Sequence, residues 1–386
     1  MPIILERIPE KKAKPPRPVT SRWLIFGVMV LAVGMGLTFL FWEGERSGPR
    51  FWLFAVVLPV LLWGAMFSAR RAGYKYRCVG QDAANRTIKA RYNDDTGRGQ
   101  RFAWYAGEYL VNALEGLHVA TQNAALAKTP ILQPVMPRGA EKPVRHSRLA
   151  EEGNASDVLN VYQHEAVERI NLLLDALPES MTCYLALDLA EGLPDISLSW
   201  LPGITRSVIH IRDLSGLWII DYWLDYHYAK PSALLVISVQ LNDFPADDSG
   251  EALAVVLMTN CRLKDTPLKS ARIHRPQINS TDDMCHALRH AMLWAGLEKD
   301  AQLRGWITGG RLASSDTLST ACDIYAPELT AQRYVNIDSV AGFAGVTAPW
   351  QALILATRQC IAEREAQLVV TESSPGYRQI CVVTPE

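Results

Sequence analysis

The strongest hydrophobic pattern in the chain is a pair of long apolar runs near its N-terminus, at residues 23–42 and 51–69. Each run is long enough to cross a bilayer, because about 20 helical residues at about 1.5 Å rise span roughly 30 Å of hydrocarbon. Trp23, Trp42, Trp52 and Trp63 lie at or near the ends of the runs, where their rings favour the membrane interface. A cleaved signal peptide would be shorter and would start earlier. The pattern predicts a hairpin of two transmembrane helices.

Basic residues predict the orientation of this hairpin. The tail 1–22 carries six Lys and Arg residues and the stretch 70–77 carries four, whereas the connecting loop 43–50 carries only Arg46 and Arg50. Positive charge stays on the cytoplasmic side. We therefore expect both termini and everything after residue 69 to be cytoplasmic, with residues 43–50 outside.

The remaining chain alternates between short apolar runs and amphipathic segments, which is the pattern of an α/β fold. Continuous apolar runs such as 232–240 and 251–260 indicate strands covered on both faces. Ser156 or Asp157 is expected to cap a helix that follows it. The expected strands lie at 181–189, 206–213, 232–240, 251–260, 304–310, 333–340 and 377–385, with a strand pair at 74–90. The expected helices lie at 104–126, 158–177, 215–229, 280–297 and 350–365, and 129–156 reads as an extended loop.

Composition narrows the class further. About half of the 386 residues are hydrophobic and the formal net charge is −1, which argues against a disordered chain and against a nucleic-acid-binding protein. Seven cysteines are scattered without a CxxC pair, so we expect buried thiols in a reducing compartment rather than a zinc knuckle. They are Cys78, Cys183, Cys261, Cys285, Cys322, Cys360 and Cys381.

Two groups of polar residues raise the question of chemistry. Cys285, His286 and His290 share one predicted helix, with Asp282 and Asp283 one turn earlier, so they could hold zinc or copper. A protein zinc site needs at least three ligands, and we favour two polar positions beside an apolar stripe.

Ser215, Asp213 and His210 could form a nucleophilic triad. No G-x-S-x-G turn is present in the sequence, and serine before a helix is an ordinary N-cap. We therefore favour capping by Ser215.

Three further features have two interpretations each. Gly342, Gly345 and Thr347 could cradle a phosphate at a helix start, but the loop lacks the Walker lysine, and a tight turn is the simpler interpretation. The segment 128–148 is either a partner-binding loop or a connector, and we favour partner contact. The aromatic residues of 218–228 are either dimer-interface anchors or core; they are Trp218, Tyr222, Trp223, Tyr226 and Tyr228.

The order of elements after residue 156 resembles the thiolase superfamily, and the ketosynthases in particular. The stretches "LSGLWIIDYWLDYHYA", "SALLVISVQ" and "SGEALAVVLMTN" follow one another as the nucleophile helix, core strand and "GE" strand do in that family. The stretches "DDMCHALRHAMLWAGLEKDAQLRGWITGGRLASSD" and "YVNIDSVAGFAGVTAPWQALILATRQCIAERE" resemble its second half. The resemblance implies a thiolase-like domain whose halves span 72–249 and 250–386.

The resemblance also locates the loops that carry catalysis in the family. Arg212, Asp213, Leu214 and Ser215 stand at the nucleophile position; Thr308, Gly309 and Gly310 stand in the first catalytic loop; Gly342 and Phe343 stand in the second. None of these is a cysteine or a histidine. We therefore expect no catalytic residues, no cofactor and no enzyme activity.

A two-span anchor joined to such a domain resembles the type VI lipase adapter family. This implies a bacterial inner-membrane protein that binds a phospholipase effector and helps load it onto the spike of a type VI secretion system, with a homodimer left open. The alternatives are a membrane-bound acyl-transfer enzyme with relocated residues, such as Cys183, Cys285 or His286, and an immunity protein.

Overall fold

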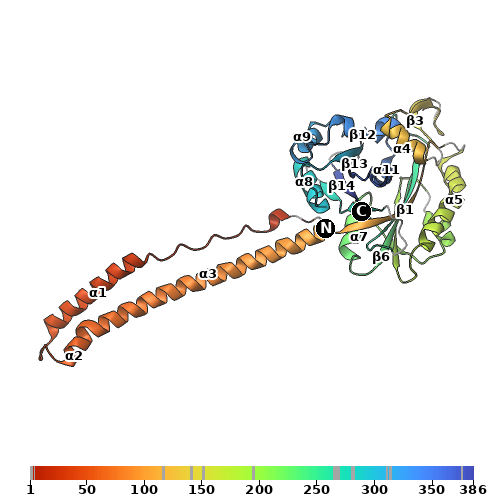
Figure 1. Ribbon diagram of the computed structural model, residues 1–386. Coiled ribbons are helices and arrows are strands. Elements are labelled where there is room, and N and C mark those ends of the chain that lie inside the picture. The colour runs from red at the N-terminus through yellow and green to blue at the C-terminus, as the bar shows by residue number, and fades with distance from the viewer. Residues whose placement is uncertain are drawn as a thin grey trace. The chain divides into compact units, whose positions relative to one another are not determined.

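The computed structural model describes residues 3, 5–114, 118–139, 142–149, 153–193, 196–263, 270–279, 283–309, 312, 315–374 and 377–386 (Figure 1). The chain divides into two compact units. One comprises Ile4–Asp95, which we call the anchor unit. The other comprises Thr96–Glu386 together with Met1–Ile3, and we call it the main domain.

The anchor unit contains two helices that are long and apolar enough to cross a membrane. The first is α1 (Thr20–Phe41), with a mean hydropathy of 2.5. The second stretch begins with α2 (Pro49–Trp52), passes through the π-helical turn η2 (Leu53–Val57) and continues as α3 (Leu58–Gly99), and an 18-residue window within it has a mean hydropathy of 2.1. The π turn immediately precedes Pro59, whose missing N–H interrupts ordinary helix bonding. The two predicted apolar helices are present, whereas their place in a membrane and their orientation stay predictions.

Residues 74–90 differ from the sequence-based prediction. We expected a strand pair, but the whole segment belongs to α3. Eight of its 17 residues are alanine, arginine, lysine or glutamine, all good helix formers. Because the preceding apolar helix is already nucleated, these residues extend it at little cost.

The main domain is built from two copies of one five-strand arrangement. The first copy consists of β1 (Phe102–Asn112), β4 (Thr182–Leu189), β5 (Ile209–Ile211), β6 (Ser232–Gln240) and β8 (Ala252–Thr259). These lie in the order β5-β4-β6-β8-β1, with β8 antiparallel to both of its neighbours.

The second copy repeats the first strand for strand. Its members are β9 (Ala271–His274), β11 (Leu303–Thr308), β12 (Tyr334–Asn336), β13 (Ala366–Ser374) and β14 (Tyr377–Pro385). They lie in the order β12-β11-β13-β14-β9, again with the fourth strand antiparallel to both neighbours. β1 and β9 pair with each other and join the copies, and β10 (Gln277–Asn279) adds to β14. β8 thus belongs to the first copy and β9 to the second, and the bounds 72–249 and 250–386 expected for the two halves stay a prediction.

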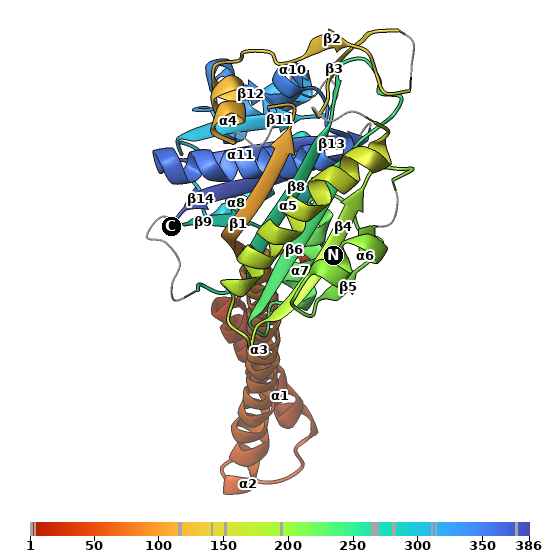
Figure 2. The same ribbon diagram turned by 90° about the vertical axis from the view of Figure 1, so that its right-hand side faces the viewer.

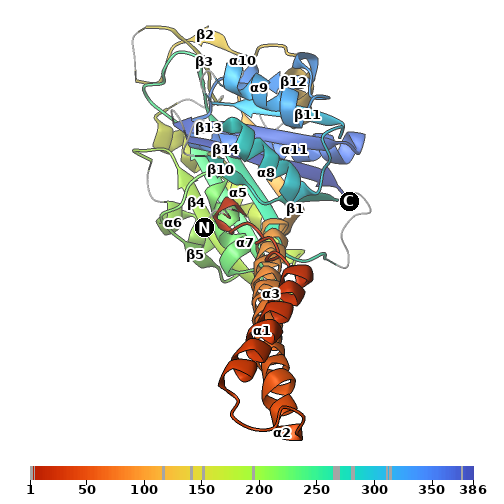
Figure 3. The same cartoon turned by 90° about the vertical axis from the view of Figure 1, so that its left-hand side faces the viewer.

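Three apolar cores give the domain its layers. The central core packs α7 (Trp218–Tyr226) and α11 (Ala348–Glu363) between side chains from both halves of the sheet. The second core packs α5 (Ala155–Asp175) on the first copy, and the third packs α8 (Met284–Ala295) and α9 (Asp316–Tyr325) on the second copy. Figure 2 shows α5 over β4, β6 and β8, and Figure 3 shows α8 on the other side of the domain. The expected α/β class is confirmed.

Two further predictions of secondary structure are wrong. The expected helix 104–126 is strand β1 followed by the short helix α4 (His118–Leu126), because β1 pairs over eight residue pairs with β8, and this long-range pairing outweighs local periodicity. The expected strand 333–340 stops at Asn336, whose side chain caps α10 (Ile337–Ala341). The cap of α5 is Asn154, in a capping box with Asp157, rather than Ser156 or Asp157 alone.

Candidate functional site

The fold brings the loops singled out from the sequence to one end of the sheet. Thr308 of β11 stands level with Thr371 of β13, and Thr371 stands level with Gln379 of β14. The Gln379 Oε1 atom accepts a hydrogen bond of 2.7 Å from the Leu217 amide at the start of α7. The loop after β11 and the loop before α7 therefore lie at the same end of these paired strands.

A buried carboxylate occupies the N-terminal end of α7. Asp188, from the end of β4, is 3% exposed and accepts hydrogen bonds from the Gly216 amide at 2.7 Å and from the Trp350 indole Nε1 at 2.8 Å. Burial raises the pKa of Asp188, although these two hydrogen bonds act in the opposite direction. The indole of Trp350, from α11, is itself fully buried. Asp188 and Trp350 thus lie at the start of α7 and are buried there.

This arrangement corrects the predicted role of Ser215. That side chain is exposed, α7 begins at Trp218, and its N-cap is Leu217 without a side-chain cap. Gln379 accepts the Leu217 amide that a capping side chain would otherwise bind.

Two hydroxyl groups extend the polar cluster around Asp188. Ser238 of β6 donates to the Asp188 carbonyl at 2.9 Å, and its Oγ also lies 2.9 Å from the Thr347 Oγ1. Ser238 and Thr347 are fully buried. Because Thr347 immediately precedes α11, the starts of the two central helices are fixed against the same strand ends.

The loop that begins at Thr308 is bound by a second buried carboxylate. Asp338 of α10 accepts hydrogen bonds from the Thr308 hydroxyl and, at 2.7 Å, from the Gly309 amide. Burial raises the pKa of Asp338, with both hydrogen bonds opposing it. Gly310, the third residue predicted in this loop, lies outside the described residues.

The glycine loop before α11 serves backbone geometry. Gly342 has a φ of 78°, and a Cβ atom there would collide with the Ser249 carbonyl. The Phe343 amide donates to the Asp248 carbonyl at 2.9 Å, and the Gly250 amide donates to the Phe343 carbonyl at 3.0 Å. Further along the same loop, the Val346 amide donates to Gln240 Oε1 at 3.2 Å. These contacts support the interpretation of the loop as a tight turn.

The first copy carries an insertion, residues 113–154, that has a much shorter counterpart in the second copy. It supplies β2 (Gln133–Val135) and β3 (Val144–Ser147), which form a small sheet with β7 (Ser249–Gly250) in the order β2-β3-β7. The segment expected to be an extended loop therefore contains two strands. The Ser147 hydroxyl donates to the Ala341 carbonyl, and the Ile131 amide donates to the Val340 carbonyl at 2.8 Å. The insertion covers the outside of the glycine loop.

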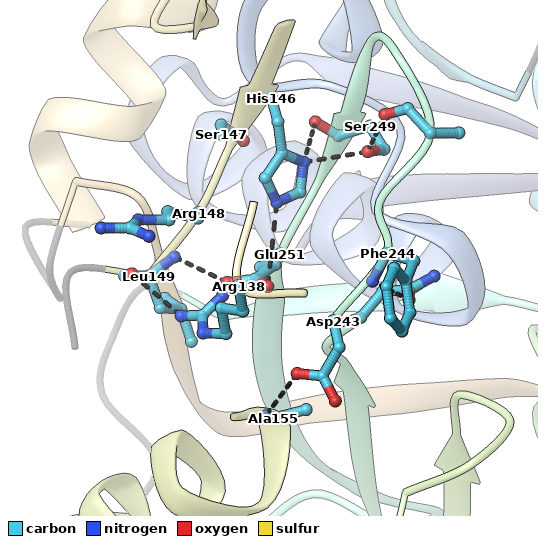
Figure 4. A network of polar contacts seen from close by, with 12 residues as sticks. Arg138, His146, Ser147, Arg148, Leu149, Ala155, Asp243, Phe244, Ser249 and Glu251 are labelled. Carbon is cyan, nitrogen blue, oxygen red and sulfur yellow. Dashed lines mark hydrogen bonds and ion pairs between the residues drawn. The ribbon is translucent and has the colours of Figure 1, made fainter. Parts of the chain in front are cut away.

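A buried charge network holds the insertion together (Figure 4). The Arg138 Nη1 atom lies 2.5 Å from Glu251 Oε1, the Leu149 amide donates to Glu251 Oε2 at 2.9 Å, and His146 Nε2 lies 3.7 Å from Glu251 Oε1. All three charged or ionisable side chains are at most 3% exposed. Burial alone would raise the pKa of Glu251, but His146, Arg138 and the Leu149 amide together lower it.

A pocket of about 390 Å³ lies beside β5 and α7. Tyr184 and His227 stack along its wall with ring centroids 4.0 Å apart, and burial lowers the pKa of His227. His210 and Asp213, two members of the conceivable triad, line this pocket, but Ser215 is not among its lining residues. The third candidate therefore does not share this pocket with the other two.

The aromatic residues of α7 divide between core and surface. Trp223 is fully buried, whereas Tyr226 is 58% exposed and lies 4.6 Å from Tyr222 between ring centroids. The core interpretation holds for Trp223, and the interface interpretation stays a prediction for Tyr226.

The histidine pair of α8 is adjacent as its spacing implies. The rings of His286 and His290 have centroids 4.2 Å apart, and His290 is buried with its Nδ1 3.1 Å from the His286 carbonyl oxygen. The Asp283 side chain caps the helix by accepting the His286 amide at 2.9 Å. Asp282 lies outside the described residues, and the expectation of no metal stays a prediction.

Sequence reasoning missed Asp188, Trp350 and Gln379, which define the centre of the site. The sequence does contain one indication that Asp188 is unusual, because it is the one charged residue in the apolar strand "TCYLALDL". A lone carboxylate in a strand covered on both faces must find buried donors. Nothing in the local sequence of Trp350 or Gln379 indicates that they meet it.

Comparisons with known proteins address the fold. No family model matches the chain, and no curated protein matches it. Among solved structures, the ishigamide ketosynthase/chain length factor is similar with a TM-score of 0.51 and 13% identity, over 73% of this chain and 99% of that chain.

Two other solved structures are similar at lower scores. A type II PKS acyl-carrier protein in complex with its ketosynthase has a TM-score of 0.49 and 11% identity, over 74% and 99% of the two chains. The 3-oxoacyl-acyl-carrier-protein synthase III from Aquifex aeolicus VF5 has a TM-score of 0.41 and 12% identity, over 73% and 99%. With the doubled strand arrangement, the first of these similarities shows that the main domain has a thiolase-like, ketosynthase-related fold.

Proposed function

We propose that this protein is a non-enzymatic, membrane-anchored adapter that binds a phospholipase effector and helps load it onto the spike of a type VI secretion system. The observation that carries the non-enzymatic part is the occupied N-terminus of α7. Asp188 and Gln379 accept the Gly216 and Leu217 amides, and the Trp350 indole fills the space beside them.

Acyl transfer in a thiolase-like fold needs open donors at this place. A thiolate and a developing oxyanion are stabilised by free backbone amides and by the helix dipole. In this chain those amides already have acceptors, and a carboxylate would repel a thiolate. Of the relocated candidates, Cys183 lacks activation, because it is 2% exposed and burial raises its pKa.

The insertion supplies a surface for protein recognition. It is a long elaboration of the first copy whose described residues are held by the network around Glu251, and long elaborations of a compact domain tend to carry function. Met136, which is 49% exposed, stands on the insertion, and Phe244, which is 69% exposed, stands on the loop whose Asp243 carbonyl accepts the Gly139 amide of the insertion. Two apolar side chains on a fixed scaffold suit a protein contact.

Co-purification tests the proposal. The tagged full chain in detergent should retain a phospholipase, inactivated at its own active site, whose gene neighbours this one. The variant Phe244→Ser should weaken retention at least tenfold, whereas Ile324→Ser, at a 45% exposed position on α9, should not. Loss of retention by both variants alike, or no retention of any such phospholipase, would contradict the adapter role. Rescue of cells from a neighbouring toxin without any bound phospholipase would favour an immunity protein.

A further inference from the structure

The N-terminal tail and α3 lie side by side within the anchor unit. The Asn85 side chain donates to the Lys12 carbonyl and accepts the Lys12 amide, both at 2.9 Å, and Lys14 lies 3.9 Å from Asp82. The two segments therefore run antiparallel, and tail residues have defined partners on α3. The tail is extended here, from Lys12 to the start of α1, and not an independent leader.

An aromatic layer marks where the apolar part of this hairpin ends. The Trp63 indole donates to the Trp23 carbonyl at 2.8 Å, and Trp63 stacks on Phe67 with ring centroids 5.5 Å apart. Trp23 and Phe67 also meet, at 6.1 Å between centroids. Such rings favour the headgroup level of a bilayer.

Guanidinium groups follow directly beyond this layer on both helices. Arg22 precedes Trp23, and Arg70 and Arg71 follow Phe67 within one turn; all three are exposed. The Arg71 guanidinium lies over the Phe67 ring at 5.6 Å from its centroid. The register of the helices therefore gathers three cations from distant parts of the sequence on one side of the aromatic layer.

An apolar groove of about 460 Å³ leads away from the other side of the same layer. It lies between α1 and the helix that pairs with it, and its lining residues run from Phe26 and Leu62 to Leu37 and Phe54. Close packing at Gly34, where a Cβ atom would collide with Pro59, brings the helices together at its floor. The groove is lined by apolar side chains apart from Thr38, whose hydroxyl donates to the Gly34 carbonyl at 2.8 Å.

We propose that this groove and the three arginines form one binding site for an anionic phospholipid. The acyl chain lies in the groove, the glycerol region lies at the Trp23–Trp63 layer, and the phosphate is bound by Arg22, Arg70 and Arg71. Arginine suits this role because its planar fork of donors binds phosphate oxygens in pairs. The proposal goes beyond the adapter role and does not depend on any cargo.

Lipid titration of the full chain in detergent, followed by native mass spectrometry, tests the headgroup part. Phosphatidylglycerol should bind more tightly than phosphatidylcholine with identical acyl chains, because each cation near an anionic headgroup contributes about a fivefold gain. Three cations predict a preference on the order of a hundredfold. Soluble glycerol phosphate should bind far more weakly, since it has no chain for the groove. Equal binding of the two lipids would overturn the proposal. If glycerol phosphate bound as tightly as phosphatidylglycerol, the site would be one for free phosphate and the lipid-site proposal would be refuted.

Variants separate the two halves of the site. Replacement of Arg22, Arg70 and Arg71 by glutamine should abolish the preference, and replacement by lysine should keep most of it. The matched control replaces Arg46 and Arg50, in the loop at the opposite end of the helices, by glutamine and should change nothing.

A bulky residue tests the groove. Val33→Trp, inside the groove, should weaken both lipids at least tenfold, whereas Val28→Trp, 68% exposed and outside the lining, should not. Circular dichroism verifies that each variant keeps its helices. A preference that survives the glutamine variant, or an equal loss in the two tryptophan variants, would refute the site.

Discussion

Replacing Trp350 by phenylalanine tests the packing in front of α7. The indole is fully buried and its Nε1 donates to Asp188 at 2.8 Å, so the change removes a hydrogen bond to a buried carboxyl group while keeping an aromatic ring. A hydrogen bond to a charged group contributes about 1.5–3 kcal/mol, and the smaller ring adds a cavity term. We expect Trp350→Phe to lower the free energy of unfolding by about 2–4 kcal/mol.

Urea unfolding of residues 96–386, followed by circular dichroism, gives the measurement. Trp200 provides the matched control, because it is also fully buried and, among the described residues, its indole nitrogen has no hydrogen-bond partner. Trp200→Phe removes the same volume but no such bond, so the difference between the two variants should be about 1.5–3 kcal/mol. In an Asp188→Ala background, the extra penalty of Trp350→Phe should fall below about 0.5 kcal/mol. Equal losses in both single variants, or an unchanged penalty in that background, would refute the reasoning.

Three further predictions concern stability. Since burial raises the pKa of Asp338 in the folded state, the folded chain binds that proton more tightly, so this group's destabilising contribution is present above the raised pKa and fades as the pH falls through it towards the unfolded value of about 3.9. On acidification from neutral pH to about pH 4, the urea midpoint of Asp338→Asn should therefore rise less or fall more than that of the parent chain, and equal changes would contradict this. Gly342→Ala should lose about 1–3 kcal/mol in thermal unfolding and more than Gly192→Ala, which shares a positive φ but has open space around it. Glu251→Leu should cost about 3–5 kcal/mol by removing the carboxylate that balances the buried Arg138 charge, and adding Arg138→Met should restore part of it; no recovery would count against the network.

The sequence predicts the buried strands, the long helices and the class of the fold, because these depend on local runs and caps. The strands β6 and β8 are continuous apolar runs, and α8 has Asp283 and Gly296 at its ends, both readable in the sequence. Strand β1 was mistaken for a helix because its partners β8 and β9 lie more than a hundred residues away in the chain.

The candidate site is harder to predict, for a related physical reason. The resemblance in element order locates the loops of the site. It does not predict which side chains contact those loops. Asp188, Trp350 and Gln379 come from β4, α11 and β14, and only the doubled sheet brings them together. A hydrogen bond between residues far apart in the sequence produces no periodic pattern of hydrophobic positions. The tight turn at Gly342, by contrast, needs a positive φ, and the glycine itself indicates this in the sequence.

Intact-mass measurement of the full chain after incubation with acyl-thioesters tests the central claim most directly. With the amides at the start of α7 already bound by Asp188 and Gln379, we expect the mass to stay that of the unmodified protein and the thioester to hydrolyse at its background rate. A stable acyl adduct that a single Cys→Ala change abolishes, at Cys183 or Cys285 for example, would contradict the account and identify an acyl-transfer enzyme.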